Sequence, residues 1–203
     1  GIDNVIVSLP IYELNLQVDS EINDKDKPKK GYTFFYPSTP MIHKNFETVC
    51  QAFSLLKQRG FDAKVIITLD GSENKYARKI YDSYHAQDNV LFSGTLDRKQ
   101  MADHYNRCDG VVFLSKIESW GLPVSEAKEF GKPIFVSDLP YAKETVGEYD
   151  RAKFIDPEDP DALARAIGVF ISGRIDYDPT KPTYYKPPFA RSWEELIALI
   201  LPS

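Results

Sequence analysis

Short apolar runs alternate with longer segments of helical periodicity along most of this chain. A run with few polar residues suits a strand buried on both faces, and the segments between the runs are long enough to cross back over a sheet as helices. The alternation therefore predicts an α/β fold: a Rossmann-like parallel sheet of about six strands, with right-handed crossovers and helices on both faces. The runs expected to form strands are Tyr32–Tyr36, Lys64–Leu69, Asn89–Phe92, Gly110–Leu114, Pro133–Val136 and Ala152–Ile155.

The segments between the runs carry start signals for helices. Asn45 is expected to cap the first helix with its side chain. Asp97 followed by Gln100 is a capping-box pattern, and Leu96 and Met101 have the spacing of a hydrophobic staple around that cap. Further helices are expected after Ser72, over Pro123–Phe130 and Pro140–Val146, after Asp159, and over Trp193–Leu201.

Two segments lie outside this pattern. Residues 19–30 are dense in charged side chains, which indicates a solvated loop. Residues 174–188 contain several prolines among tyrosines, which indicates an extended surface path. We therefore divide the chain into a lead-in segment with a charged loop (1–31), a Rossmann-like domain (32–173), and an extended segment with a final helix (174–203).

Composition excludes several classes of protein. The net charge is −5 and no basic stripe is interleaved with aromatic residues, so nucleic acid is not an expected partner. No apolar run approaches the roughly 20 residues that span a bilayer, so the chain reads as soluble. Cys50 and Cys108 lie in apolar patterns and read as reduced core residues. His43, His85 and His104 share no ligand spacing, so no metal is expected.

The stretch from Phe113 to Glu126 leaves a predicted strand and enters a predicted helix. Ligands of an open parallel sheet bind beyond the carboxyl ends of its strands, so motifs at strand exits are the candidates for a site. Gly121 permits close approach of a ligand to the backbone, and Pro123 at the first helical position leaves neighbouring amides able to meet an anion. A plain tight turn beside two surface glutamates, Glu118 and Glu126, explains the spacing equally well.

The pattern Glu118-x-x-Gly121-x-x-x-x-Glu126, followed by Gly131-Lys-Pro, resembles the donor-binding signature of retaining GT-B glycosyltransferases, the group that includes family four. Further matches flank it in the family's order, at His43-Lys44-Asn45 and along Asn89–Gly94 and Ala102–Ser115. The resemblance covers roughly residues 32–173. It implies that this region is the nucleotide-sugar-binding, C-terminal half of a GT-B fold.

The resemblance also implies a role for each matching residue. Glu126 would accept hydrogen bonds from the ribose hydroxyls of the donor, and Glu118 would lie beside the transferred sugar near its anomeric carbon. Lys44 would neutralise the diphosphate, and the amides of Gly121 and Leu122 would meet the sugar or the diphosphate. The implied donor-binding residues are Thr39, Lys44, Gly94, Ser115, Glu118, Gly121, Leu122 and Glu126, of which Lys44 and Glu118 would be catalytic, with no cofactor and no metal.

Three positions depart from the family's pattern. Thr39 stands where many members carry an arginine, so one cation for the diphosphate is missing. The family's Gly-x-Gly after the second strand is reduced to Leu69-Asp-Gly71, which puts contacts to base or phosphate there in doubt. Trp120 replaces the more usual phenylalanine and reads as packing.

The function implied by the resemblance is donor binding in a retaining glycosyltransferase of hexosyltransferase type. Such an enzyme transfers a sugar from a nucleoside diphosphate sugar to an acceptor hydroxyl in glycan, polysaccharide or lipopolysaccharide synthesis. The chain would be half of the enzyme and inactive alone, and its partners would be the nucleotide sugar, an N-terminal acceptor-binding domain and a membrane glycolipid acceptor. The expected location is the cytoplasm, at the inner face of the membrane for the full-length protein.

Two other functions remain open on the sequence. A non-catalytic module that binds a nucleotide or nucleotide sugar would carry the same binding residues. A flavodoxin-like domain would need a phosphate loop after the first strand, and Tyr36-Pro-Ser-Thr-Pro-Met41 fits that poorly because it has no glycine and two prolines.

Overall fold

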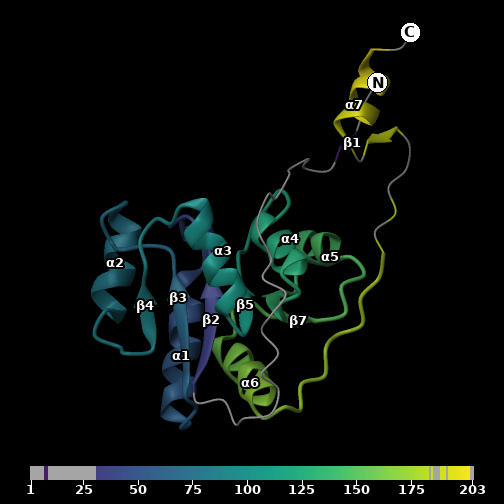
Figure 1. Cartoon of the computed structure of the whole chain (residues 1–203). Coiled ribbons are helices and arrows are strands. Elements are labelled where there is room, and N and C mark those ends of the chain that lie inside the picture. The colour runs from purple at the N-terminus through teal and green to yellow at the C-terminus, as the bar shows by residue number, and fades with distance from the viewer. Residues whose placement is uncertain (1–6, 9–30, 183, 185–187, 191, 202–203) are drawn as a thin grey trace.

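The computed structural model describes residues 7–8, 31–182, 184, 188–190 and 192–201. Its main feature is a six-stranded parallel sheet with the order β4-β3-β2-β5-β6-β7 (Figure 1). The first strand of the region lies inside the sheet and the order reverses there, which confirms the predicted Rossmann-like layout. The strands are β2 (Tyr32–Tyr36), β3 (Ala63–Ile67), β4 (Val90–Phe92), β5 (Gly110–Phe113), β6 (Ile134–Ser137) and β7 (Ala152–Ile155).

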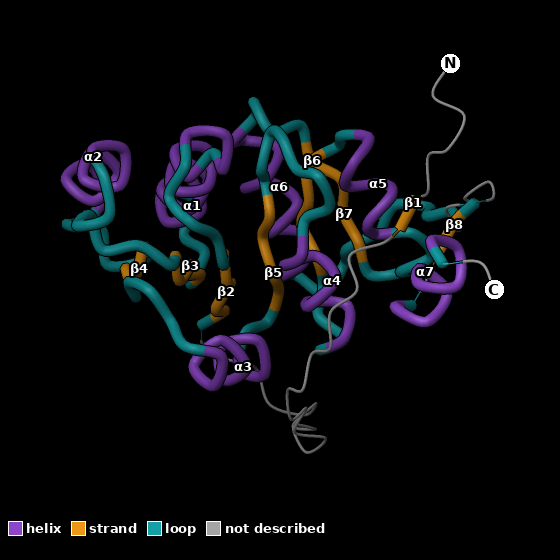
Figure 2. The backbone as a smooth tube through the Cα atoms, turned by 90° about the horizontal axis from the view of Figure 1, so that it is seen from above, coloured by secondary structure: helices purple, strands orange, loops and turns teal. Residues whose placement is uncertain are grey.

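Helices cover both faces of this sheet, as predicted. In Figure 2, α1 and α6 lie on one face, where they pack against each other, and α3 and α4 lie on the other. The helices are η1 (Ile42–Lys44), α1 (Phe46–Gln58), α2 (Lys75–Tyr84), α3 (Arg98–Arg107), α4 (Leu122–Glu129), α5 (Pro140–Val146), α6 (Pro160–Ile171) and α7 (Trp193–Ile200).

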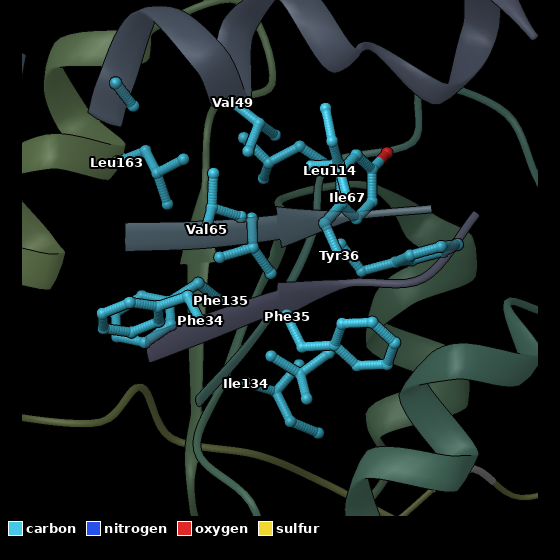
Figure 3. Packing of buried hydrophobic residues seen from close by; sticks show 14 of the residues in the cluster. Phe34, Phe35, Tyr36, Val49, Val65, Ile67, Leu114, Ile134, Phe135 and Leu163 are labelled. Atoms are coloured by element: carbon cyan, nitrogen blue, oxygen red, sulfur yellow. The ribbon is translucent and has the colours of Figure 1, made fainter. Parts of the chain in front are cut away.

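The aromatic residues of β2 join the two layers of the core. Successive side chains of a strand point to opposite faces of the sheet. Phe34 meets Phe53 of α1 edge-on at 5.6 Å, whereas Phe35 meets Tyr105 of α3 at 5.2 Å on the other face. Figure 3 shows Phe35 on the opposite side of the sheet from Val49 of α1. Burial on both faces explains why the strands read as continuous apolar runs.

The two thiols lie in this core. Cys50 and Cys108 are both buried and free, which confirms their interpretation as reduced core residues. Burial raises the pKa of the Cys108 thiol to about 12, and burial also raises the pKa of the Cys50 thiol. Neither thiol therefore ionises near neutral pH.

The cap of α3 forms as predicted. The Gln100 amide donates to Asp97 Oδ1 at 2.8 Å, and the Asp97 amide donates to Gln100 Oε1 at 2.9 Å. This reciprocal pair satisfies two of the amides that a helix start leaves without intrahelical acceptors.

Asn45 occupies the N-cap position of α1, as predicted, but the expected capping bond from its side chain is absent. Its backbone is left-handed (φ 60°). Its Nδ2 donates instead to the carbonyl oxygens of Leu114 at 3.2 Å and Pro157 at 2.7 Å, and its Oδ1 accepts from the Thr48 hydroxyl at 2.8 Å. Two buried carbonyl groups from distant loops compete for this side chain, and they outweigh the local capping bond.

The segment after α6 runs along the edge of the sheet without a helix or strand in residues 174–182. Asp178 fastens it there, because its amide donates to the Ala152 carbonyl at 3.0 Å and its carboxylate accepts from the Phe154 amide at 2.7 Å. These bonds protect part of the exposed edge of β7. The predicted charged loop, 19–30, lies outside the described residues.

A second, two-stranded parallel sheet was not predicted. It pairs β1 (Val7–Ser8) with β8 (Phe189–Ala190), and α7 follows it (Figure 1). The lead-in and final segments thus meet, and this small unit stands apart from the six-stranded sheet. Among the described residues, no helix has the length and apolar character needed to cross a membrane.

Candidate functional site

A cavity of about 370 Å³ opens where β2, β3 and β4 end and where α3 and α4 begin. Its walls combine apolar side chains with the hydroxyls of serine and threonine. Among the residues described around it, Glu126 alone is charged. The lining residues are Pro37, Ser38, Thr39, Pro40, Thr68, Thr95, Leu96, Met101, Leu122, Pro123 and Glu126.

Glu126 reaches the cavity from α4, and a tyrosine of α3 holds its carboxylate. The Tyr105 hydroxyl donates to Glu126 Oε2 at 2.6 Å. Burial raises the pKa of the Glu126 carboxyl and Glu129 raises it further, while the Tyr105 hydrogen bond acts in the opposite direction. The cavity therefore contains a partly desolvated carboxylate, which can accept hydrogen bonds from a ligand.

Lys44 and Glu118 form an ion pair at the same edge of the sheet. The side chains are only 15% and 13% exposed, so this pair is screened much less than a surface pair. The Lys44 ammonium also lies 5.6 Å from the centre of the Phe113 ring, within range of a cation–π contact. The structure thus brings together the two residues for which the family resemblance implied catalytic roles.

Hydrogen bonds connect the turn that carries Lys44 to the loop that carries Glu118. The Lys116 amide donates to the His43 carbonyl at 2.7 Å, and the Ser115 hydroxyl lies 3.3 Å from the same oxygen. Tyr141 donates its hydroxyl to the Ser115 carbonyl at 2.7 Å, and burial raises the pKa of Tyr141 to about 12. Tyr141 is therefore a neutral donor near pH 7.

The last residue of β2 also holds the turn that carries Lys44. The hydroxyl of Tyr36, the last residue of β2, donates to the Lys44 carbonyl oxygen. Burial, with smaller contributions from neighbours that include Glu118, raises the pKa of Tyr36 well above its usual range. The hydroxyl keeps its proton, so the bond to the turn is maintained at any ordinary pH.

Gly121 occupies a position that only glycine fits well. Its φ is 89°, and a Cβ there would lie 3.3 Å from the Phe113 ring and 3.4 Å from the Tyr141 ring. It precedes α4, whose first amides have no intrahelical acceptor. Pro123 occupies the second position of α4, not the predicted first, because Leu122 already belongs to the helix.

The candidate residues fall into three groups. Thr39, Leu122 and Glu126 line the cavity. Lys44 and Glu118 pair beside it. The other three candidates shape the backbone nearby instead of lining the cavity: Gly94 has a positive φ just before Thr95, Ser115 is fully buried, and Gly121 starts α4.

The departures from the family pattern have local explanations. The amides of Asp70 and Gly71 both donate to the carboxylate of Glu73, at 2.9 and 3.0 Å, so this chain supplies its own acceptor for them. Trp120 packs half-buried, and its indole N–H donates to the Ser125 hydroxyl at 3.0 Å. Among the described residues, no group of three or more His, Cys, Asp or Glu side chains could hold a metal ion.

Several residues around the candidate site carry no distinctive sequence signal. Tyr105 and Tyr141 were not singled out, because a tyrosine at helical spacing indicates core packing as readily as contact with a site. Leu96 and Met101 have the spacing of a hydrophobic staple, yet both line the cavity. Their position just after β4 was the available signal, since ligands bind beyond strand ends.

Comparison with known proteins places this geometry in context. A family model described as "Glycosyl transferases group 1" matches residues 17–184. The N-acetyl-alpha-D-glucosaminyl L-malate synthase of Bacillus anthracis is 31% identical over 117 residues, which cover 54% of this chain and 30% of that protein. The uncharacterized glycosyltransferase YqgM of Bacillus subtilis is 30% identical over 94 residues, or 46% of this chain and 26% of that protein.

A solved structure shares the fold. Anabaena Alr3699/HepE, determined in complex with UDP-glucose, superposes with a TM-score of 0.60 at 21% identity, covering 70% of this chain and 40% of that one. This likeness agrees with the predicted Rossmann-like fold. The chain spans about a quarter to a third of the length of the two curated relatives.

Proposed function

The chain belongs to the group 1 glycosyl transferases, and from that premise we propose that it is the donor-binding domain of a retaining glycosyltransferase. It binds a nucleoside diphosphate sugar and presents the anomeric carbon for transfer to an acceptor hydroxyl with retention of configuration. The observation that carries this proposal is the juxtaposition, at one sheet edge, of the Glu126 cavity and the Lys44–Glu118 pair.

The cavity is suited to the nucleoside. Its prolines, Leu96 and Met101 offer apolar surface to a base, and its hydroxyls offer hydrogen bonds. Glu126 accepts from the vicinal ribose hydroxyls, because a carboxylate has two oxygens that can each take a hydrogen bond. The nucleoside thereby sits with its 5′ end directed towards the diphosphate-binding groups.

Lys44 and the start of α4 meet the diphosphate. The ammonium is a point charge that can follow the phosphate as negative charge builds on the leaving group. The amides of Gly121 and Leu122 add donors at the positive end of the α4 dipole. Thr39 lines the cavity with a hydroxyl in place of the arginine of many members, so Lys44 carries more of the neutralisation, without a metal ion.

Glu118 lies by the transferred sugar. In this structure it pairs with Lys44, and a diphosphate competes with it for the same ammonium. Once Lys44 turns to the phosphate, the Glu118 carboxylate is available to the sugar hydroxyls near the anomeric carbon. Donor binding and the placement of Glu118 are thereby coupled.

The acceptor is bound elsewhere. The chain spans well under half of its relatives, which supports a second, N-terminal domain that binds the acceptor and completes the cleft. The acceptor is a hydroxyl of a growing glycan in polysaccharide or lipopolysaccharide synthesis, carried by a glycolipid at the cytoplasmic face of a membrane. This chain alone therefore binds donor and transfers nothing.

Calorimetry and a transfer assay test the proposal. UDP, GDP and ADP are titrated into the chain with and without a chelator, and the 203 residues are then incubated with the matching sugar donors and an acceptor. We expect chelator-independent binding of at least one nucleotide and no transfer. Absence of binding to all three contradicts the donor site, and transfer by the chain alone contradicts the two-domain requirement. A full-length protein that binds donor but transfers nothing is a nucleotide-binding module instead.

A further inference from the structure

Tyr105 touches the proposed ribose carboxylate, and nothing in the family pattern above gives it a role. It lies in the last turns of α3 and is fully buried. Its ring stacks on Phe130 with centres 5.2 Å apart and planes at 13°, and it meets Phe35 edge-on at 5.2 Å. These contacts on the face and the edge of the ring restrict it to one orientation, so the position of its hydroxyl is fixed.

That fixed hydroxyl donates to Glu126 Oε2 at 2.6 Å. The terminal torsion of a glutamate is broad, so an unrestrained carboxylate samples many orientations. One short bond from a rigid donor removes that freedom before a ligand binds. Each oxygen still has lone pairs to offer, so the carboxylate remains able to accept from two neighbouring hydroxyls.

This inference rests on the proposed function. We propose that Tyr105 is a positioning residue that holds the Glu126 carboxylate in the orientation required by a ribose diol. The hydroxyl of Tyr105 thereby gives the site its preference for ribonucleotides over 2′-deoxyribonucleotides. The conformational entropy of the carboxylate is already lost on folding, so it does not oppose ligand binding.

The charge on Glu126 supports the same role. Two titratable groups act on this carboxyl: Tyr105 from α3 and Glu129 from its own helix. The other residues described around the cavity are apolar or carry hydroxyl groups that do not titrate near neutral pH. Burial and Glu129 raise the pKa of the carboxyl, and the Tyr105 hydrogen bond lowers it, so removal of the hydroxyl raises the pKa further.

The test is Tyr105→Phe, which removes one oxygen and keeps the ring. UDP, GDP and ADP, each with its 2′-deoxy form, are titrated by calorimetry. We expect affinity for the ribonucleotide to fall about three- to tenfold, the range of one hydrogen bond, and affinity for the 2′-deoxy form to fall about twofold or less. On acidification, binding should be lost at a higher pH in the variant than in the parent chain.

Two further variants separate positioning from structural damage. Tyr149→Phe removes the hydroxyl of a half-buried tyrosine, which donates to the Lys132 carbonyl at 2.8 Å outside the cavity, and should change neither affinity. Glu126→Asp shortens the side chain that Tyr105 holds without altering the tyrosine. Loss of the same ribonucleotide preference in this variant would assign the preference to the carboxylate, whereas a retained preference would contradict the inference even if Tyr105→Phe folds poorly.

The outcomes are distinct. Equal losses of affinity for the ribo and deoxy forms, or a pH dependence of binding identical to that of the parent chain, would show that Tyr105 is merely structural. Either result would overturn this inference and leave the proposed function intact. Failure of the parent chain to bind UDP, GDP or ADP overturns the proposed function, and the inference falls with it.

Discussion

The Lys44–Glu118 ion pair gives each residue a charge partner inside the protein. Both side chains are largely withdrawn from water, where loss of one partner is costly because the other charge is left desolvated. A diphosphate carries more negative charge than a carboxylate and competes for the ammonium. At the scale of single residues, the pair is therefore expected to respond asymmetrically to removal of the cation and removal of the anion.

Lys44→Ala should weaken UDP binding by about 1.5–3 kcal/mol, the range for a hydrogen bond to a charged group. It should leave uridine binding unchanged, because the nucleoside does not reach the ammonium. Calorimetry with both ligands measures the difference. Lys143→Ala, which removes an exposed lysine paired with Asp138, is the matched control. Equal losses for UDP and uridine would mean that Lys44 only supports the fold.

Glu118→Gln, unlike Lys44→Ala, should not weaken UDP binding. Removing the carboxylate charge frees Lys44 for the phosphates, so UDP affinity should be maintained or increased. In a two-domain protein the same change should lower kcat by more than it raises KM, because the group acts near the anomeric carbon in the transition state. A marked loss of UDP affinity with normal kcat would rule out this assignment.

At the scale of elements, Asn45 links three parts of the fold. It precedes α1, and its side-chain amide bridges the loop after β5 to the loop before α6. Its turn also carries Lys44, so the same side chain steadies the site. Local capping signals place most helix starts correctly, but they do not reveal a bridge of this kind.

Asn45→Ala should destabilise the chain by about 2 kcal/mol, because two buried carbonyl oxygens lose their donor. For a chain of this size the melting temperature should fall by about 4–8 °C. Thermal unfolding measures it. Asp97→Ala removes an ordinary helix cap, a bond from the Gln100 amide at 2.8 Å, and should cost only about 1 kcal/mol. Similar shifts for the two variants would argue against the bridge.

At the scale of the whole molecule, the candidate site reduces stability for the sake of binding. Burial raises the pKa of Glu126, so the folded protein binds that proton more tightly than the unfolded chain does. Its contribution to stability is therefore present at low pH and is lost as pH rises from the usual glutamate value through the raised one. A desolvated carboxylate in a binding site is one way in which binding is gained at the expense of stability.

Glu126→Gln should therefore raise the melting temperature at neutral pH while it weakens nucleotide binding. The gain should shrink as pH falls and Glu126 in the parent chain becomes protonated. Thermal unfolding across mildly acidic to neutral pH, with calorimetry on UDP, measures both effects. Glu194→Gln, at the exposed start of α7, is the control and should show no such gain. Lower stability at neutral pH would contradict the cost assigned to Glu126.

The sequence by itself determined the order of elements and the edge of the sheet where the candidate site lies. Apolar runs and helical periodicity are local signals, and parallel strands send their carboxyl ends to one edge. That rule drew attention to Glu118 and Glu126, and the family resemblance added Lys44 as a candidate. The capping box at Asp97 also followed from neighbouring residues alone.

Only the tertiary structure decided which side chains meet. Lys44 and Glu118 are 74 positions apart, and Tyr105 and Glu126 are 21 apart, so no local pattern reports their pairing. The pairing of β1 with β8 is equally remote in sequence. These contacts depend on how helices pack against the sheet and on which buried polar groups lack partners. Packing is a property of all the elements together, and spacing along one chain does not encode it.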